Sequence, residues 1–168
     1  AADNICGGDS RYLGSQGSSV LKVFSMTAAV TGVSETNAKK AGLDADAVVL
    51  SPMSHAGYYP GGKLMTMKVI FEKETFRLLG AQIVGYEGVD KRIDVLAAAI
   101  HAGLTAIRLK DLDLAYAPPY SSAKDPVNMA GFLIENLAKG VVKQFRIEDV
   151  GGLPRDGSVT LLDARTPQ

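Results

Sequence analysis

L-M-T-M-K-V-I-F-E at residues 64–72, followed by F-R-L-L-G-A-Q-I-V-G at 76–85, is the stretch on which the predicted fold depends. Apolar residues alternate with polar ones along the first run, which is typical of a strand with one buried face. The buried side is expected to consist of Met65, Met67, Val69 and Phe71. Lys73-Glu74-Thr75 separates the two runs and predicts a turn, so the runs are expected to pair as an antiparallel hairpin.

Helical periodicity follows this hairpin and indicates the fold class. One apolar stripe is formed by Ile93, Leu96, Ala97, Ile100 and Leu104. A second helix is predicted over 125–139. Asp125 can cap it, Pro126 suits its first position, and Gly140 follows its end. Strands followed by grouped helices favour an α+β fold, in which helices pack on an antiparallel sheet.

The chain before the hairpin is predicted to contain helices, a loop, a strand and a turn. Residues 1–6 are expected to be the tail of a helix, and 7–17 a glycine-rich loop. A further helix is predicted to begin at Ser18 or Ser19 and to end at Gly32, with an apolar side of Val20, Val23, Phe24 and Ala28. The elements expected next are a short helix over 34–41 capped by Ser34, a strand over 46–54 and a turn over 55–62.

Composition excludes several classes of function. The 168 residues are enough for one good-sized domain, and 18 basic residues balance 18 acidic ones. No basic field is therefore expected to gather nucleic acid or an anionic membrane. No run approaches the roughly 18 apolar residues of a membrane span. One cysteine and two distant histidines make a metal site unexpected, and the cytoplasm is the expected location.

Both ends are expected to be cut from a longer polypeptide. The helix tail at residues 1–6 has no start, and V-T-L-L-D-A at 159–164 is predicted to be a buried strand without partners. The sequence also contains no complete catalytic apparatus. A dinucleotide-binding G-x-G-x-x-G, a P-loop, an H-E-x-x-H and a G-x-S-x-G are all missing.

The connector A-Y-A-P-P-Y-S-S-A-K-D-P at 115–126 is the stretch richest in chemical groups. Pro118 and Pro119 make it stiff, which suits the presentation of phenol groups and an ammonium group to a ligand. The alternative is an ordinary loop with two half-buried tyrosines. Lys91 and Arg92 are similarly open between a functional role and surface charge pairs with Asp90 or Asp94 on the same helix.

Five stretches together resemble the C-terminal part of a flavin-dependent pyridine nucleotide–disulfide oxidoreductase, closest to the branch of coenzyme A-disulfide reductases and NADH oxidases. They are A-A-D-N-I-C-G-G at 1–8, Q-G-S-S-V-L-K-V-F at 16–24, H-A-G-Y-Y-P-G at 55–61, E-G-V-D-K-R-I-D-V-L at 87–96 and A-Y-A-P-P-Y-S-S-A-K-D-P-V-N at 115–128. I-E-D-V at 147–150 and V-T-L-L-D-A-R-T-P at 159–167 resemble the opening of a fused rhodanese-like domain.

The resemblance implies a domain organisation and a set of site residues. Residues 1–35 would be the end of the FAD-binding domain, 36–143 the dimerisation domain, and 144–168 the start of the rhodanese-like domain. Tyr58 and Tyr116 would be catalytic residues that reach into the partner subunit's active site. Tyr116 would also contact the flavin, and Lys124 would bind coenzyme A.

The resemblance also implies an activity for the full-length protein: a homodimer that uses FAD and NAD(P)H to reduce coenzyme A disulfide, a persulfide or a polysulfide. The redox cysteine and the cofactor loops of the family would lie before Ala1. The fragment alone is therefore expected to bind no FAD tightly and to be inactive. The alternatives are an NADH oxidase or peroxidase of the same family, or a stand-alone dimerisation or interaction module.

Overall fold

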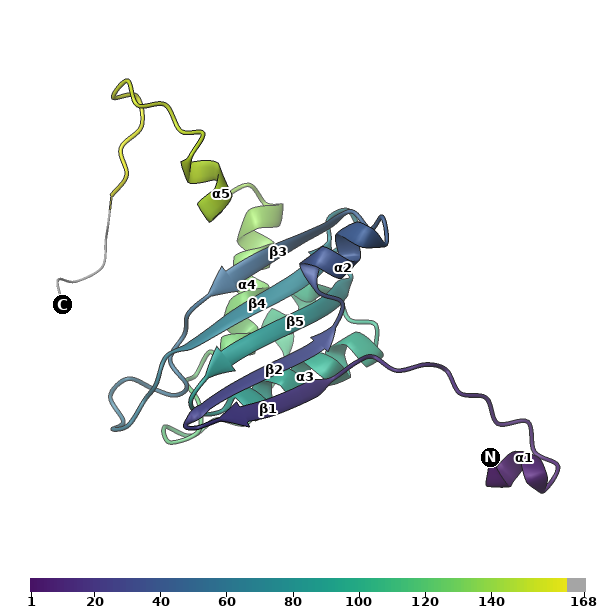
Figure 1. Ribbon diagram of the computed structural model, residues 1–168. Coiled ribbons are helices and arrows are strands. Elements are labelled where there is room, and N and C mark those ends of the chain that lie inside the picture. The colour runs from purple at the N-terminus through teal and green to yellow at the C-terminus, as the bar shows by residue number, and fades with distance from the viewer. Residues whose placement is uncertain (163–168) are drawn as a thin grey trace. The chain divides into compact units, whose positions relative to one another are not determined.

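The computed structural model describes residues 1–162, which form two compact units, residues 1–135 and residues from Asn136 onward. The first unit is built on a five-stranded sheet (Figure 1). Its strands are β1 (Ser19–Val23), β2 (Met26–Gly32), β3 (Ala45–Leu50), β4 (Met65–Glu72) and β5 (Leu78–Gly85). The helices of the chain are α1 (Ala2–Ile5), α2 (Glu35–Lys40), α3 (Val89–His101), the 3-10 helix η1 (Ala106–Asp111), α4 (Pro126–Ala138) and α5 (Ile147–Val150).

The strands are arranged in the order β1-β2-β5-β4-β3, and every neighbouring pair is antiparallel. The predicted hairpin is the β4–β5 pair at the centre of the sheet. Helices α3 and α4 lie behind the sheet as drawn in Figure 1, and α3 packs against β2 and β5. The alternation in β4 buries Met65, Met67 and Val69. The α+β prediction, with helices packed on an antiparallel sheet, is therefore confirmed.

The predicted helix between Ser18 and Gly32 is wrong, because this segment forms the β1–β2 hairpin. Its apolar residues happen to match helical spacing, but β2 gains a full ladder of hydrogen bonds from β5. The turn residues Phe24 and Ser25 also carry no ordinary turn signal, and Phe24 adopts a positive φ of 53°. Two strands of the sheet thus come from residues 19–32. These residues were expected to belong to the end of the preceding domain.

The other predicted elements form, with small shifts of their ends. The side chain of Ser34 accepts a hydrogen bond from the Asn37 backbone and so caps α2. The expected strand over 46–54 is shorter and is β3. Residues 159–162 have no regular structure, in contrast to the predicted strand over 159–164, whose last residues lie outside the described part of the chain.

Helix α4 approaches η1 so closely that glycine is needed at the contact. A Cβ atom at Gly131 would lie 2.3 Å from the backbone nitrogen of Lys110. Asn128, three residues earlier on the helix, donates hydrogen bonds from its side-chain amide to the carbonyls of Leu109 and Leu112. These contacts fix the start of α4, and with it the end of the 115–126 connector.

Candidate functional site

The two tyrosines expected to be catalytic meet in the structure. The hydroxyl oxygens of Tyr58 and Tyr116 are 2.6 Å apart, although the residues are 58 positions apart in sequence. Both side chains face solvent, with Tyr58 75% exposed and Tyr116 46% exposed. The structure therefore presents a pair of linked phenols on the surface of the first unit.

The hydrogen bond between the two phenols changes the acidity of Tyr116. The bond to Tyr58 is the main cause that raises the pKa of Tyr116 above its ordinary value. Either hydroxyl can donate in this bond, because each phenol carries one proton and can also accept one. The hydroxyl that accepts keeps its own proton available for a ligand.

Tyr58 lies in the turn between β3 and β4. An isolated bridge between Met53 and Leu64 closes this turn, and the Ser54 backbone donates to the carbonyl of Lys63 at 2.8 Å. The Ala56 backbone N–H donates to the Ser121 carbonyl at 3.0 Å. The turn that carries Tyr58 is thus bonded directly to the connector that carries Tyr116.

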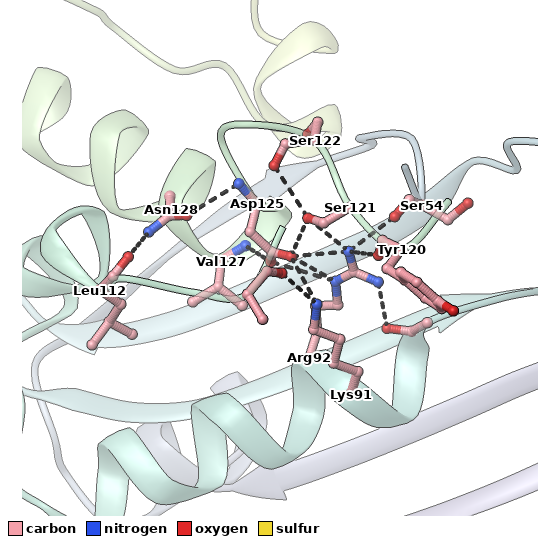
Figure 2. Close-up of polar contacts among 12 residues, drawn as sticks. Ser54, Lys91, Arg92, Leu112, Tyr120, Ser121, Ser122, Asp125, Val127 and Asn128 are labelled. Carbon is pink, nitrogen blue, oxygen red and sulfur yellow. Dashed lines mark hydrogen bonds and ion pairs between the residues drawn. The ribbon is translucent and has the colours of Figure 1, made fainter. Parts of the chain in front are cut away.

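Arg92 is the largest fully buried side chain and lies where these segments converge (Figure 2). Its Nε and Nη2 atoms donate to the Asp125 carboxylate, with 2.9 Å between Nη2 and Oδ2. Nη2 also donates to the Ser54 carbonyl at 2.9 Å and to the Tyr120 carbonyl at 3.2 Å. Nη1 donates to the Gly88 carbonyl at 3.2 Å. One guanidinium therefore joins α3, the turn, the connector and the start of α4.

Of the two alternatives left open for Lys91 and Arg92, the structure does not form the surface charge pairs with Asp90 or Asp94. Arg92 is 1% exposed and pairs with Asp125. Lys91 is partly buried, and its amino group donates to the Ala115 carbonyl at 3.3 Å and lies 4.0 Å from Asp125. Long-range pairing has replaced the local pairs because the connector folds back over the first turn of α3.

Asp125 serves both the ion pair and the helix that follows it. Its Oδ1 accepts the Val127 backbone N–H at 3.0 Å and so caps α4, as expected from sequence. Burial raises the pKa of this carboxyl. Hydrogen bonds from Ser121, Val127 and Arg92, together with the Arg92 charge, outweigh that effect and hold the pKa below its ordinary value. Asp125 is therefore a carboxylate at neutral pH.

Arg92, Ser121 and Asp125 were missed as site residues, although the sequence carries a signal for one of them. Arg92 falls between Val89 and Leu96 at spacings of three and four residues, on the buried face of α3. A charged residue at such a position needs a buried partner. Spacing alone could not identify Asp125 as that partner.

Lys124 lies beside the network, on the surface. Its amino group is 5.0 Å from the centre of the Phe132 ring, a cation–π contact. Among residues 1–162, no hydrogen bond joins Lys124 to Tyr58 or Tyr116. The structure thus brings Tyr58 and Tyr116 together and places Lys124 apart from their hydroxyls, on the side of the connector next to α4.

A cavity of about 270 Å³ opens next to the buried arginine. It is lined by Ser54, His55, Glu87, Gly88, Lys91, Arg92, Pro119 and Tyr120. Its volume is below the roughly 300–1,000 Å³ of sites that enclose small-molecule ligands. A cofactor-sized ligand therefore needs further walls besides this cavity.

No helix within residues 1–162 has both the length and the apolar character that crossing a lipid bilayer requires.

Comparisons with known proteins agree with this fold. The family model described as pyridine nucleotide-disulphide oxidoreductase, dimerisation domain, matches residues 18–127. A coenzyme A disulfide reductase of Staphylococcus epidermidis is 39% identical over 132 residues, which are 78% of this chain and 30% of the relative. The chain thus spans less than a third of the length of this curated relative.

Two solved structures share the fold at higher identity. The crystal structure of reduced CoADR-RHD from Bacillus anthracis has a TM-score of 0.87 and 46% identity, covering 93% of this chain and 28% of that one. The NAD-dependent persulfide reductase from A. fulgidus has a TM-score of 0.83 and 44% identity, covering 88% and 28%. Through residues 18–127, the chain belongs to the dimerisation-domain family of the pyridine nucleotide-disulphide oxidoreductases.

Proposed function

We propose that this chain is the dimerisation part of a flavin-dependent NAD(P)H oxidoreductase that reduces coenzyme A disulfide, a persulfide or a polysulfide. The observation that carries the proposal is the exposed pair of phenols formed by Tyr58 and Tyr116. The names of the relatives, a coenzyme A disulfide reductase and a persulfide reductase, support the substrate class.

The phenol pair suits a reaction that releases a thiolate. A tyrosine with an ordinary pKa near 10 stays protonated at neutral pH and can donate a hydrogen bond to developing negative charge. In the bond between Tyr58 and Tyr116, the hydroxyl that accepts becomes a stronger donor to a further group. We assign Tyr58 the contact with the substrate sulfur, and Tyr116 the support of Tyr58 and a contact with the flavin.

The cofactors supply the electrons, and this chain supplies groups that bind and orient. FAD and NAD(P)H are proposed to be held mainly by segments outside this chain, since the nucleotide-binding loops are not found in it. The fit of Tyr116 to a flavin contact rests on its exposed ring. Lys124 is a compact cation that suits a phosphate of coenzyme A, and its stem is held against the Phe132 ring.

We propose that two copies assemble so that each presents its tyrosines to the active site of the other. The small cavity beside Arg92 supports this, because a ligand there needs walls from elsewhere. Helix α4 supports it too, since Phe132 remains 37% exposed on a largely apolar helix. The chain alone is expected to be inactive and to bind no FAD tightly.

The order of domains forms part of the proposal. The family match begins at residue 18 and β1 at Ser19, so we place the end of the FAD-binding domain before the sheet, earlier than the boundary at residue 35 expected from sequence. Residues 144–168 are proposed to begin a rhodanese-like domain, on the strength of the I-E-D-V and V-T-L-L-D-A-R-T-P motifs.

Anaerobic spectrophotometry of the full-length protein tests the proposal. NADH is expected to bleach a flavin absorbance band, and coenzyme A disulfide is expected to restore it. Recovery with oxygen or peroxide alone would instead favour the NADH oxidase or peroxidase. A full-length protein without flavin would reject the reductase and leave a dimerisation or interaction module.

A further inference from the structure

We infer that Arg92 is a positioning residue for the phenol pair, because its guanidinium ties the turn that carries Tyr58 to the connector that carries Tyr116. The structural part of this inference stands on contacts within the chain. Its consequence for turnover rests on the function proposed above.

The geometry of the Arg92 contacts supports a positioning role. The Nη2 atom donates to the Ser54 carbonyl at 2.9 Å and to the Tyr120 carbonyl at 3.2 Å (Figure 2). Ser54 lies four positions before Tyr58, and Tyr120 lies four positions after Tyr116. A shift of either carbonyl is therefore passed along a short piece of backbone to a phenol.

The neighbouring bonds make this link rigid. The Ser121 hydroxyl donates to Oδ2 of Asp125 at 2.6 Å, and Nη2 of Arg92 lies 3.3 Å from the same hydroxyl. The Ala56 backbone donates to the Ser121 carbonyl at 3.0 Å. Among the described residues, no buried side-chain nitrogen or oxygen lacks a partner. A fully bonded polar network holds one geometry, because any displacement breaks several bonds at once.

Only an arginine can make this set of contacts. The guanidinium offers five N–H groups in a planar fork, whereas a lysine offers three from a single point. Burying an ion pair brings little net stability compared with packed apolar side chains. The pair is therefore better explained by the position in which it holds the turn and the connector.

Lys91 gives the connector a second attachment to the same helix. Its Nζ donates to the carbonyl of Ala115, which is the residue immediately before Tyr116. Lys91 and Arg92 thus hold the connector at Ala115 and at Tyr120, on either side of Pro118 and Pro119. The first turn of α3 therefore serves as a fixed base for the segment that presents Tyr116.

The test is a titration of the tyrosines in this chain, labelled with ¹³C at the ring carbon that bears the hydroxyl. Six resonances are expected from the six tyrosines, and replacement of Tyr58 and Tyr116 by phenylalanine assigns two of them. In Arg92→Lys we expect a folded chain in which Tyr116 titrates at lower pH, because the bond to Tyr58 is lost. An unchanged Tyr116 titration in folded Arg92→Lys overturns the inference.

Arg108→Lys is the matched control. Arg108 makes an ion pair with Asp111 at 2.9 Å, but both side chains are exposed and neither touches the network. This variant is expected to leave all six titrations unchanged. A Tyr116 shift of equal size in Arg108→Lys would show that an Arg→Lys change outside the network has the same effect. That result would also overturn the inference.

A double variant keeps the test decisive if Arg92→Lys does not fold. Arg92→Met with Asp125→Asn removes both buried charges and keeps an oxygen that can cap α4. We expect it to fold and to lose the Tyr58–Tyr116 bond; a titration identical to the native chain rejects the positioning role.

The full-length protein supplies an independent readout. Turnover of coenzyme A disulfide is expected to fall by up to about 10²-fold in Arg92→Lys, with KM nearly unchanged, because the phenols are displaced from the reacting atoms. If native protein shows no such turnover, the proposed function fails while the tyrosine titration still decides the role of Arg92. Native turnover in Arg92→Lys with a shifted titration would limit the role to structure and refute its effect on catalysis.

Discussion

Replacing Arg92 by methionine is expected to destabilise the chain strongly, because it leaves the buried Asp125 carboxylate without its ion-pair partner. Asp125 is 3% exposed in its side chain, and Arg92 is its closest cation, at 2.9 Å. Removing one partner of such a buried pair costs about 3–5 kcal/mol. A domain of ordinary stability has about 5–15 kcal/mol in total, so the loss is readily measured.

The pH dependence of this loss has a defined sign. Asp125 has a lowered pKa in the native chain, so its contribution to stability is full above its unfolded pKa of about 3.9 and is lost as pH falls through the lower, folded pKa. Without Arg92, burial favours the protonated acid. The difference between the native chain and Arg92→Met is therefore expected to be largest near neutral pH. It is expected to shrink as pH falls from the raised pKa of Asp125 in the variant to the lowered pKa in the native chain.

Urea denaturation near pH 7 and again below about pH 4, followed by circular dichroism, measures this difference in the free energy of unfolding. Arg108→Met is the control, and its exposed ion pair with Asp111 is expected to contribute less than about 1 kcal/mol. The reasoning is refuted if Arg92→Met costs no more than Arg108→Met near pH 7, or if its cost is the same at both pH values.

Three further predictions address the phenol pair and the fold. Tyr58→Phe is expected to lower the pKa of Tyr116 toward its ordinary value, and ¹³C NMR of the tyrosines checks this; a raised or constant pKa shows that the bond to Tyr58 is not the cause of the shift. Gly131→Ala is expected to cost about 1–3 kcal/mol in urea denaturation, because its Cβ would collide with the backbone of η1; native stability would show that α4 can move. Phe24→Gly is expected to raise the unfolding midpoint, since about 1–2 kcal/mol of left-handed strain exceeds the 0.5–1 kcal/mol entropic cost of glycine, and a lowered midpoint counts against this.

The parts of the fold that could be predicted are those with strong local patterns. Alternation along β4, the apolar stripe of α3 and the Asp125-Pro126 start of α4 each indicated the right element. The β1–β2 hairpin was missed because its turn is Phe24-Ser25, whereas a positive φ usually calls for glycine or asparagine. Pairing with β5, a long-range effect, decides the structure of that segment.

The candidate site was predicted in part, for a similar reason. Tyr58 and Tyr116 were identified by resemblance to a family, and their direct contact could not be inferred from spacing. Arg92 was left open between a functional role and a surface charge pair, because Asp90 and Asp94 are near it in sequence. The choice of Asp125 as its partner depends on the connector folding back onto α3, which no local pattern encodes.

The phenol pair is the centre of this account, and one kinetic measurement tests it most directly. The flavin of the full-length protein is reduced anaerobically with NADH and mixed with coenzyme A disulfide, and its reoxidation is followed in Tyr58→Phe, Tyr116→Phe and the double variant. Because the two hydroxyls act as one linked donor, each single variant is expected to lose nearly as much rate as the double variant. Native reoxidation rates in all three variants would contradict the account.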